Sequence, residues 1–193
     1  MPNWNKDGTQ LTYSSGGIRL MNADGTGSRQ LCAGWGAQWS PDGQRIAYYD
    51  GLTIMAYDMT TETSAKLYDA AADGFEQIFG NMTWSPDSQR ICFKGSRKGN
   101  EEVATVFADP QRPRMKVRYS GKSVIADFAW HPNGDRVVFC AMCAERQKFQ
   151  IYEFNPDDDG VPQLLRGQDP TTANTSVCWT PDGKRLIVIT GDF

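Results

Sequence analysis

The side chains that could carry out chemistry are few in this 193-residue chain. His131 is the only histidine. The five cysteines are Cys32, Cys92, Cys140, Cys143 and Cys178. A metal centre or an activated nucleophile needs several such groups in one place. No G-x-S-x-G, G-x-G-x-x-G or G-x-x-x-x-G-K-[ST] motif is present, so serine hydrolysis and nucleotide chemistry have no sequence signal. We therefore expect no catalytic residues, no metal and no cofactor.

Cys140 and Cys143 form a C-x-x-C pair within an apolar, strand-like segment. A redox pair of this spacing normally begins a helix, and a structural zinc site needs a second pair of ligands. Neither signal accompanies the pair. We interpret the cysteines mainly as buried thiols, with a metal or redox role for this pair as the alternative.

Three adjacent carboxylates, Asp157, Asp158 and Asp159, precede Gly160. Such a cluster offers the oxygen ligands that Ca²⁺ prefers, but its spacing matches no ordered calcium loop. A solvated turn is the favoured interpretation, and a bound cation is the alternative.

A basic cluster alternates along a predicted strand. Its members are Arg112, Arg114, Lys116 and Arg118. Alternation places these side chains on one face of the strand, where they would face water or meet an acidic partner. The charges elsewhere are dispersed, with 20 basic against 23 acidic residues and a net charge of -3. Nucleic acid is therefore an unfavoured partner.

One decapeptide theme recurs and must position all of these residues. The copies are WNKDGTQLTY at 4–13, WSPDGQRIAY at 39–48, WSPDSQRICF at 84–93, WHPNGDRVVF at 130–139 and WTPDGKRLIV at 179–188. Their tryptophans are Trp4, Trp39, Trp84, Trp130 and Trp179. This period is that of one blade of a β-propeller. His131 takes the Ser or Thr position of one copy, so we expect it to have a role in a turn.

Each copy predicts a β-hairpin. The tryptophan closes one strand, Pro and Gly favour a reversal, and an alternating apolar run follows as the next strand. Side-chain oxygens at Asp7, Asp42, Asp87, Asn133 and Asp182 are expected to accept backbone N–H bonds that hold the reversals. Further alternating segments, such as 18–31 and 50–68, supply about four strands for each unit. Such sheets must stack to bury both faces, with the tryptophans between them.

With these residues in view, the chain resembles the TolB-type β-propeller repeat, W-S-P-D-G-x-x-I-A-F. The resemblance is specific at 39–48, 84–93 and 179–188, weaker at 4–13, and altered at His131 and Asn133. It implies one propeller domain over residues 1–193, built from four-stranded antiparallel blades. Propellers of TolB, of prolyl-oligopeptidase-like peptidases and of oligogalacturonate lyases look similar, so the resemblance implies a fold and leaves function open.

The five copies are expected to form part of a larger ring of six or more blades. The first blade is expected to lack its first strand, and the last to contain two strands. Two alternatives remain open. Residues 175–189 would complete the first blade, or two chains would associate through their open edges.

The leading functional hypothesis is a non-enzymatic module that presents loops at one mouth of the ring to a protein partner. The alternative is the propeller portion of an enzyme, either a prolyl-oligopeptidase-like serine peptidase or an oligogalacturonate-lyase-like polysaccharide lyase. No apolar run is long enough to insert into a membrane. The compartment is left open: cytoplasmic if Met1 is the native start, periplasmic if a signal peptide was removed.

Overall fold

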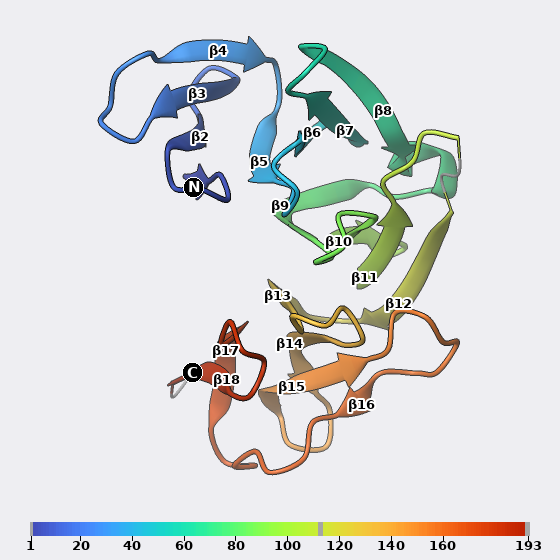
Figure 1. The fold of residues 1–193 in the computed structure, drawn as a ribbon. Coiled ribbons are helices and arrows are strands. Elements are labelled where there is room, and N and C mark those ends of the chain that lie inside the picture. Colours follow the sequence, from blue (N-terminus) through green and yellow to red (C-terminus); the bar gives the residue numbers. More distant parts are fainter. Residues whose placement is uncertain (1, 112–113, 192–193) are drawn as a thin grey trace.

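The computed structural model describes residues 2–111 and 114–191, which form an all-β fold. Five antiparallel sheets follow one another along the chain, and we name them sheets A to E in that order. The first strand of each sheet lies towards the centre of the molecule, next to the first strands of neighbouring sheets (Figure 1). Among the described residues, no helix is long and apolar enough to cross a membrane.

Four of the sheets have four strands each. Sheet A contains β1 (Asn3–Trp4), β2 (Gln10–Ser14), β3 (Ile18–Asn22) and β4 (Arg29–Cys32). Sheet B contains β5 (Trp35–Trp39), β6 (Arg45–Asp50), β7 (Thr53–Asp58) and β8 (Thr63–Asp69). Sheet C contains β9 (Gln77–Trp84), β10 (Arg90–Arg97), β11 (Asn100–Phe107) and β12 (Met115–Gly121). Sheet D contains β13 (Val124–Trp130), β14 (Val137–Cys143), β15 (Lys148–Phe154) and β16 (Gln163–Leu164). Sheet E contains β17 (Ala173–Trp179) and β18 (Leu186–Gly191), and a short 3-10 helix, η1 (Ala70–Asp73), follows β8.

The repeated four-stranded sheets confirm the expected blade architecture, and the two ends correct its details. Sheet A has four strands instead of three, because Asn3 and Trp4 pair with Thr12 and Leu11 to form a two-residue β1. The turn that follows Trp4 is enough to bring this short segment back beside β2. The C-terminal strands do not complete sheet A. They pair with each other and pack on sheet D.

Strand alternation explains how the sheets stack. On β6, Ile46 and Tyr48 pack towards sheet A, whereas Ala47, between them, packs towards sheet C. On β14, Phe139 packs towards sheet C and Cys140 towards sheet E. Because successive side chains of a strand point to opposite faces, each sheet contributes to two cores. The molecule is thus a curved series of sheets with one apolar core between each neighbouring pair.

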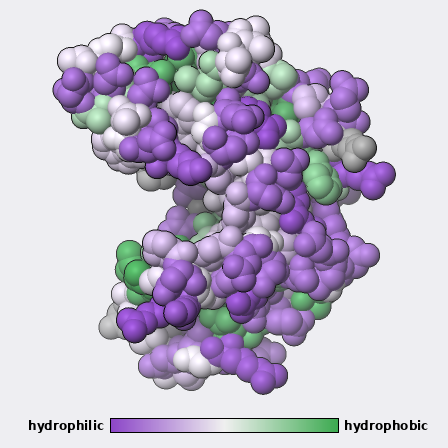
Figure 2. Space-filling view, in the orientation of Figure 1, coloured by the Kyte–Doolittle hydropathy of each residue, from purple (hydrophilic) through white to green (hydrophobic). Residues whose placement is uncertain are grey.

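Figure 1 shows that this series curves around so that the two termini lie on the same side of the molecule. The space-filling view is hollowed on that side, between the part formed by the N-terminal sheets and the part formed by the C-terminal sheets (Figure 2). The ring is therefore open over the described residues.

Candidate functional site

The repeated turns are held by short polar side chains. Ser40 Oγ lies 2.5 Å from the Asp42 carboxylate, and that carboxylate accepts the backbone N–H of Gln44 at 3.0 Å. Ser85 with Asp87, and Thr180 with Asp182, repeat this arrangement. Burial opposes ionisation of Asp42, but its hydrogen bonds from Ser40 and the Gln44 amide bring its pKa below the ordinary value. The aspartates at these three turns therefore act as ionised acceptors.

The first turn uses a different residue for the same purpose. Asn5 Oδ1 accepts the backbone N–H groups of Thr9 and Gln10 at 2.9 and 3.0 Å. Asp7, which the repeat alignment selected, lies exposed in this turn. The side-chain acceptor has thus moved two residues towards the N-terminus.

The fourth turn is built around His131, which is buried between sheets D and E. Its Nδ1 accepts the backbone N–H of Asn133 at 3.3 Å, and its Nε2 lies 3.1 Å from the Gly183 carbonyl oxygen. Its ring meets the Trp179 ring edge-on, with centroids 4.8 Å apart. Here histidine accepts the turn's N–H bond, whereas Asn133 supplies a backbone donor. The only histidine of the chain is thus used in turn and sheet contacts.

The recurrent tryptophans lie at the ends of the innermost strands. Trp39, Trp84 and Trp130 are buried within the cores between sheets, Trp179 is partly buried against sheet D, and Trp4 is exposed. Trp84 Nε1 donates to the Gln38 carbonyl of the preceding sheet at 3.0 Å.

A second recurrent residue, the arginine that begins the next strand, crosses from one sheet to the following one. Its guanidinium lies over that sheet's tryptophan in three cases: Arg45 over Trp84 at 5.0 Å, Arg90 over Trp130 at 5.5 Å and Arg136 over Trp179 at 5.5 Å. Sequence reasoning missed this pairing because it joins residues of different copies.

The cysteine pair is structural in its surroundings. Cys140 and Cys143 are both buried on β14, but their separation of three residues places them on opposite faces of the sheet. Burial raises the pKa of Cys140 to about 12, so its thiol is protonated at neutral pH. Within residues 2–111 and 114–191, no group of three or more His, Cys, Asp or Glu side chains is placed to hold a metal ion.

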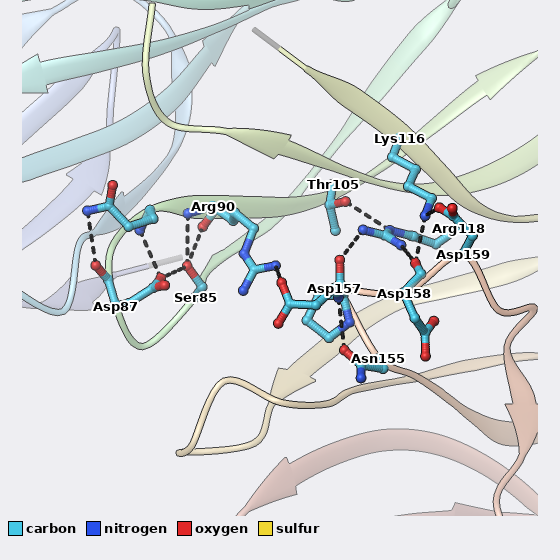
Figure 3. A network of polar contacts seen from close by, with 12 residues as sticks. Ser85, Asp87, Arg90, Thr105, Lys116, Arg118, Asn155, Asp157, Asp158 and Asp159 are labelled. Carbon is cyan, nitrogen blue, oxygen red and sulfur yellow. Dashed lines mark hydrogen bonds and ion pairs between the residues drawn. The ribbon is translucent and has the colours of Figure 1, made fainter. Parts of the chain in front are cut away.

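The acidic turn and the basic strand, which the sequence presents as separate features, meet between sheets C and D (Figure 3). Asp157 pairs with Arg90 at 2.6 Å, and Asp159 pairs with Lys116. The Asp158 carbonyl accepts hydrogen bonds from Lys116 Nζ at 2.6 Å and Arg118 Nη1 at 2.7 Å. The turn is therefore neither free in solvent nor arranged around a cation.

Arg118 is held most firmly of these basic residues. Its Nε donates to Thr105 Oγ1 at 3.0 Å, and its Nη2 donates to the Pro156 carbonyl. Burial lowers the pKa of its guanidinium. The hydrogen bond and charge of Lys116 hold the pKa of Asp159 below its ordinary value. Arg112, the first member of the predicted cluster, lies outside the described residues.

A pocket of about 590 Å³ lies beside this network, and we call it the basic pocket. Four cationic side chains line it, together with an apolar group and part of the acidic turn. These residues are Arg90, Arg114, Lys116, Arg118, Val106, Phe107, Met115, Pro156 and Asp157. Cationic groups beside an apolar surface can hold a carboxylate-bearing ligand that also presents an apolar side chain. This arrangement offers binding and contains no nucleophile with an adjacent base among its lining residues.

The stacked four-stranded sheets define this chain as a β-propeller domain that spans part of a ring. No protein-family model matches the sequence. One of the subunits of eukaryotic translation initiation factor 3 from Sclerotinia sclerotiorum is 28% identical over 133 residues, covering 60% of this chain and 18% of that protein.

Several solved propellers have a similar fold. TolB from Acinetobacter baumannii matches with a TM-score of 0.68 at 20% identity, over 97% of this chain and 45% of its own. An oligogalacturonate lyase in complex with manganese matches with a TM-score of 0.77 at 17% identity, over 97% and 57%. The tricorn protease matches with a TM-score of 0.69 at 14% identity, over 98% and 20%. The chain thus spans about half of the first two structures, and these likenesses concern the fold.

Proposed function

We propose that this domain is a non-enzymatic protein-binding module whose basic pocket holds an acidic segment of a partner protein. The observation that carries the proposal is the convergence of Arg90, Arg114, Lys116 and Arg118 around one pocket in a chain of net charge -3. A local basic site on an acidic protein selects acidic ligands and disfavours basic ones. The curated relative is itself one component of a larger factor, which is consistent with a binding role.

The acidic turn of sheet D supports the same interpretation. Asp157 and Asp159 place carboxylates against Arg90 and Lys116, as the carboxylates of a bound partner would. Both aspartates are exposed, and exposed ion pairs are worth only about 0–1 kcal/mol. A partner segment with several carboxylates and an apolar side chain would therefore compete effectively for these cations, with Phe107 and Met115 as its apolar contacts.

The test is fluorescence anisotropy with a fluorescein-labelled peptide of alternating glutamate and leucine, and with the matching glutamine peptide as control. We expect salt-sensitive binding of the glutamate peptide alone. Arg114→Glu should weaken it at least tenfold, equivalent to about 1.4 kcal/mol, whereas Lys6→Glu, an equal charge reversal on sheet A, should not.

Replacing the internal carboxylates gives a result of opposite sign. The double variant Asp157→Asn with Asp159→Asn should bind the glutamate peptide several-fold more tightly, because Arg90 and Lys116 lose their competing partners. Equal binding of the two peptides, or equal effects of the Arg114 and Lys6 variants, would refute the proposed site.

A further inference from the structure

The two end sheets each expose a face that inner sheets bury. The face of sheet A directed away from sheet B carries Trp4, Leu11 and Tyr13, and we call it the leading face. The face of sheet E directed away from sheet D carries Cys178, Ile187 and Ile189, and we call it the trailing face. Arg185, which begins the hairpin's second strand after the last repeated turn, lies beside the trailing face and is exposed.

Equivalent repeat positions show what normally covers the leading face. Trp39, Trp84 and Trp130 are 9%, 6% and 8% exposed, because a preceding sheet packs on each of them. Trp4 occupies the same position in its copy and is 51% exposed. Tyr13 is likewise less buried than its counterpart Tyr48. The leading face is therefore one half of the interface that recurs within the molecule.

The trailing face is the other half of that interface. Ile187 corresponds in the repeat to Ala47, Cys92 and Val138, which are each 0% exposed because the following sheet covers them. Ile187 and Ile189 are 55% and 61% exposed. Uncovered branched apolar side chains of this kind, side by side on one sheet, mark an interaction surface.

The recurrent arginine connects the two halves. Arg45, Arg90 and Arg136 each lie over the tryptophan of the following sheet at 5.0–5.5 Å. Arg185 holds the same position in the last copy, and no tryptophan of a following sheet lies beneath it in the described chain. Trp4 is the tryptophan of the first copy, and no arginine of a preceding sheet lies over it among the described residues. One chain thus carries an unmatched arginine and an unmatched tryptophan at opposite ends.

We propose that a second copy of this chain docks head-to-tail, with its leading face on the trailing face of the first copy and its Trp4 beneath Arg185. The contact repeats the geometry of the internal sheet-to-sheet interfaces, so it requires no new kind of surface. Because the two faces differ, the contact is heterologous, and wild-type chains add in series until the assembly closes on itself or continues as a filament.

The test is the mass of the chain in solution, measured by analytical ultracentrifugation over a wide range of concentration. Wild-type chains should associate as concentration rises. Trp4→Ala removes the leading face, and Ile187→Lys with Ile189→Lys removes the trailing face, so each variant should remain monomeric. Val161→Ser, a change at an exposed apolar residue outside both faces, should associate like wild type.

The decisive measurement is a mixture of the two monomeric variants. Each retains the face that the other lacks, so the mixture should form a one-to-one dimer and nothing larger. Thermal unfolding of each variant at low concentration, monitored by circular dichroism, establishes that it is folded. A wild-type chain that stays monomeric, or folded variants that fail to complement each other, would overturn the proposal, and some other sheet would then cover these faces.

Discussion

The arginine and tryptophan of the repeat act together although they belong to different copies. Arg45 lies over Trp84, and its guanidinium also donates to the carbonyls of Ser88 and Ala108 at 2.6 and 2.7 Å. Ser88 takes the place of the turn glycine with a positive φ of 58°, and its Oγ accepts the Asp42 N–H at 3.0 Å. This left-handed conformation costs an ordinary residue about 1 kcal/mol or more, which the bond between sheets offsets.

Trp84→Ala should lower the free energy of unfolding by about 3–5 kcal/mol, because it opens a cavity between sheets B and C. Trp4→Ala is the matched control at the same repeat position. It should cost less than about 1 kcal/mol, since Trp4 is exposed. Urea unfolding at low protein concentration measures both variants, and similar losses would show that burial between sheets does not determine the contribution of these tryptophans.

At the scale of elements, the outer strand of sheet D shows how a side chain can replace a strand. β16 has only two residues, and Gln168 continues its hydrogen bonding to β15 beyond them. Gln168 Oε1 accepts the Ile151 N–H at 2.6 Å, and its Nε2 donates to the Ile151 carbonyl at 2.8 Å. The same amide accepts a bond from Asn174 at 2.8 Å, which links sheet D to β17.

Gln168→Ala should destabilise the domain by about 1–3 kcal/mol, because the Ile151 N–H then loses its partner in a buried strand. Gln163→Ala, an exposed change on β16, should have little effect. Hydrogen exchange of the Ile151 amide gives a local measurement. The interpretation fails if exchange at Ile151 is as slow in the Gln168 variant as in wild type.

The strands and turns could be predicted from sequence because their causes are local. Alternation along 45–49 and the Pro-Asp-Gly reversal before it lie within a few residues of each other. The contacts of Gln168, Ser88 and Arg118 could not be predicted, because their partners are distant in the chain or on another sheet. The basic pocket shares this limit: its alternating cations were visible, but the acidic turn opposite them was assigned to solvent.

At the scale of the whole molecule, the repeated aspartates should make the stability depend on acid. The pKa values of Asp42, Asp87 and Asp182 lie below their ordinary values in the folded chain. Their stabilising contribution is therefore complete above the unfolded value of about 4 and is lost as pH falls through the lower folded values. Replacing Asp42 and Asp87 by Asn should flatten this loss, whereas Asp7→Asn should not. Urea unfolding between neutral and acidic pH measures the slope, and an unchanged slope in the double variant would contradict the assignment.

The uneven exposure of the tryptophans also gives the molecule an internal optical record of its own opening. Trp4 and Trp35 are in contact with water, whereas Trp39, Trp84 and Trp130 are enclosed between sheets. A soluble quencher such as iodide would reach the first pair and leave the other three emitting. Fluorescence that survives the quencher therefore reports on the joints between sheets, and the quenched fraction reports largely on the open end.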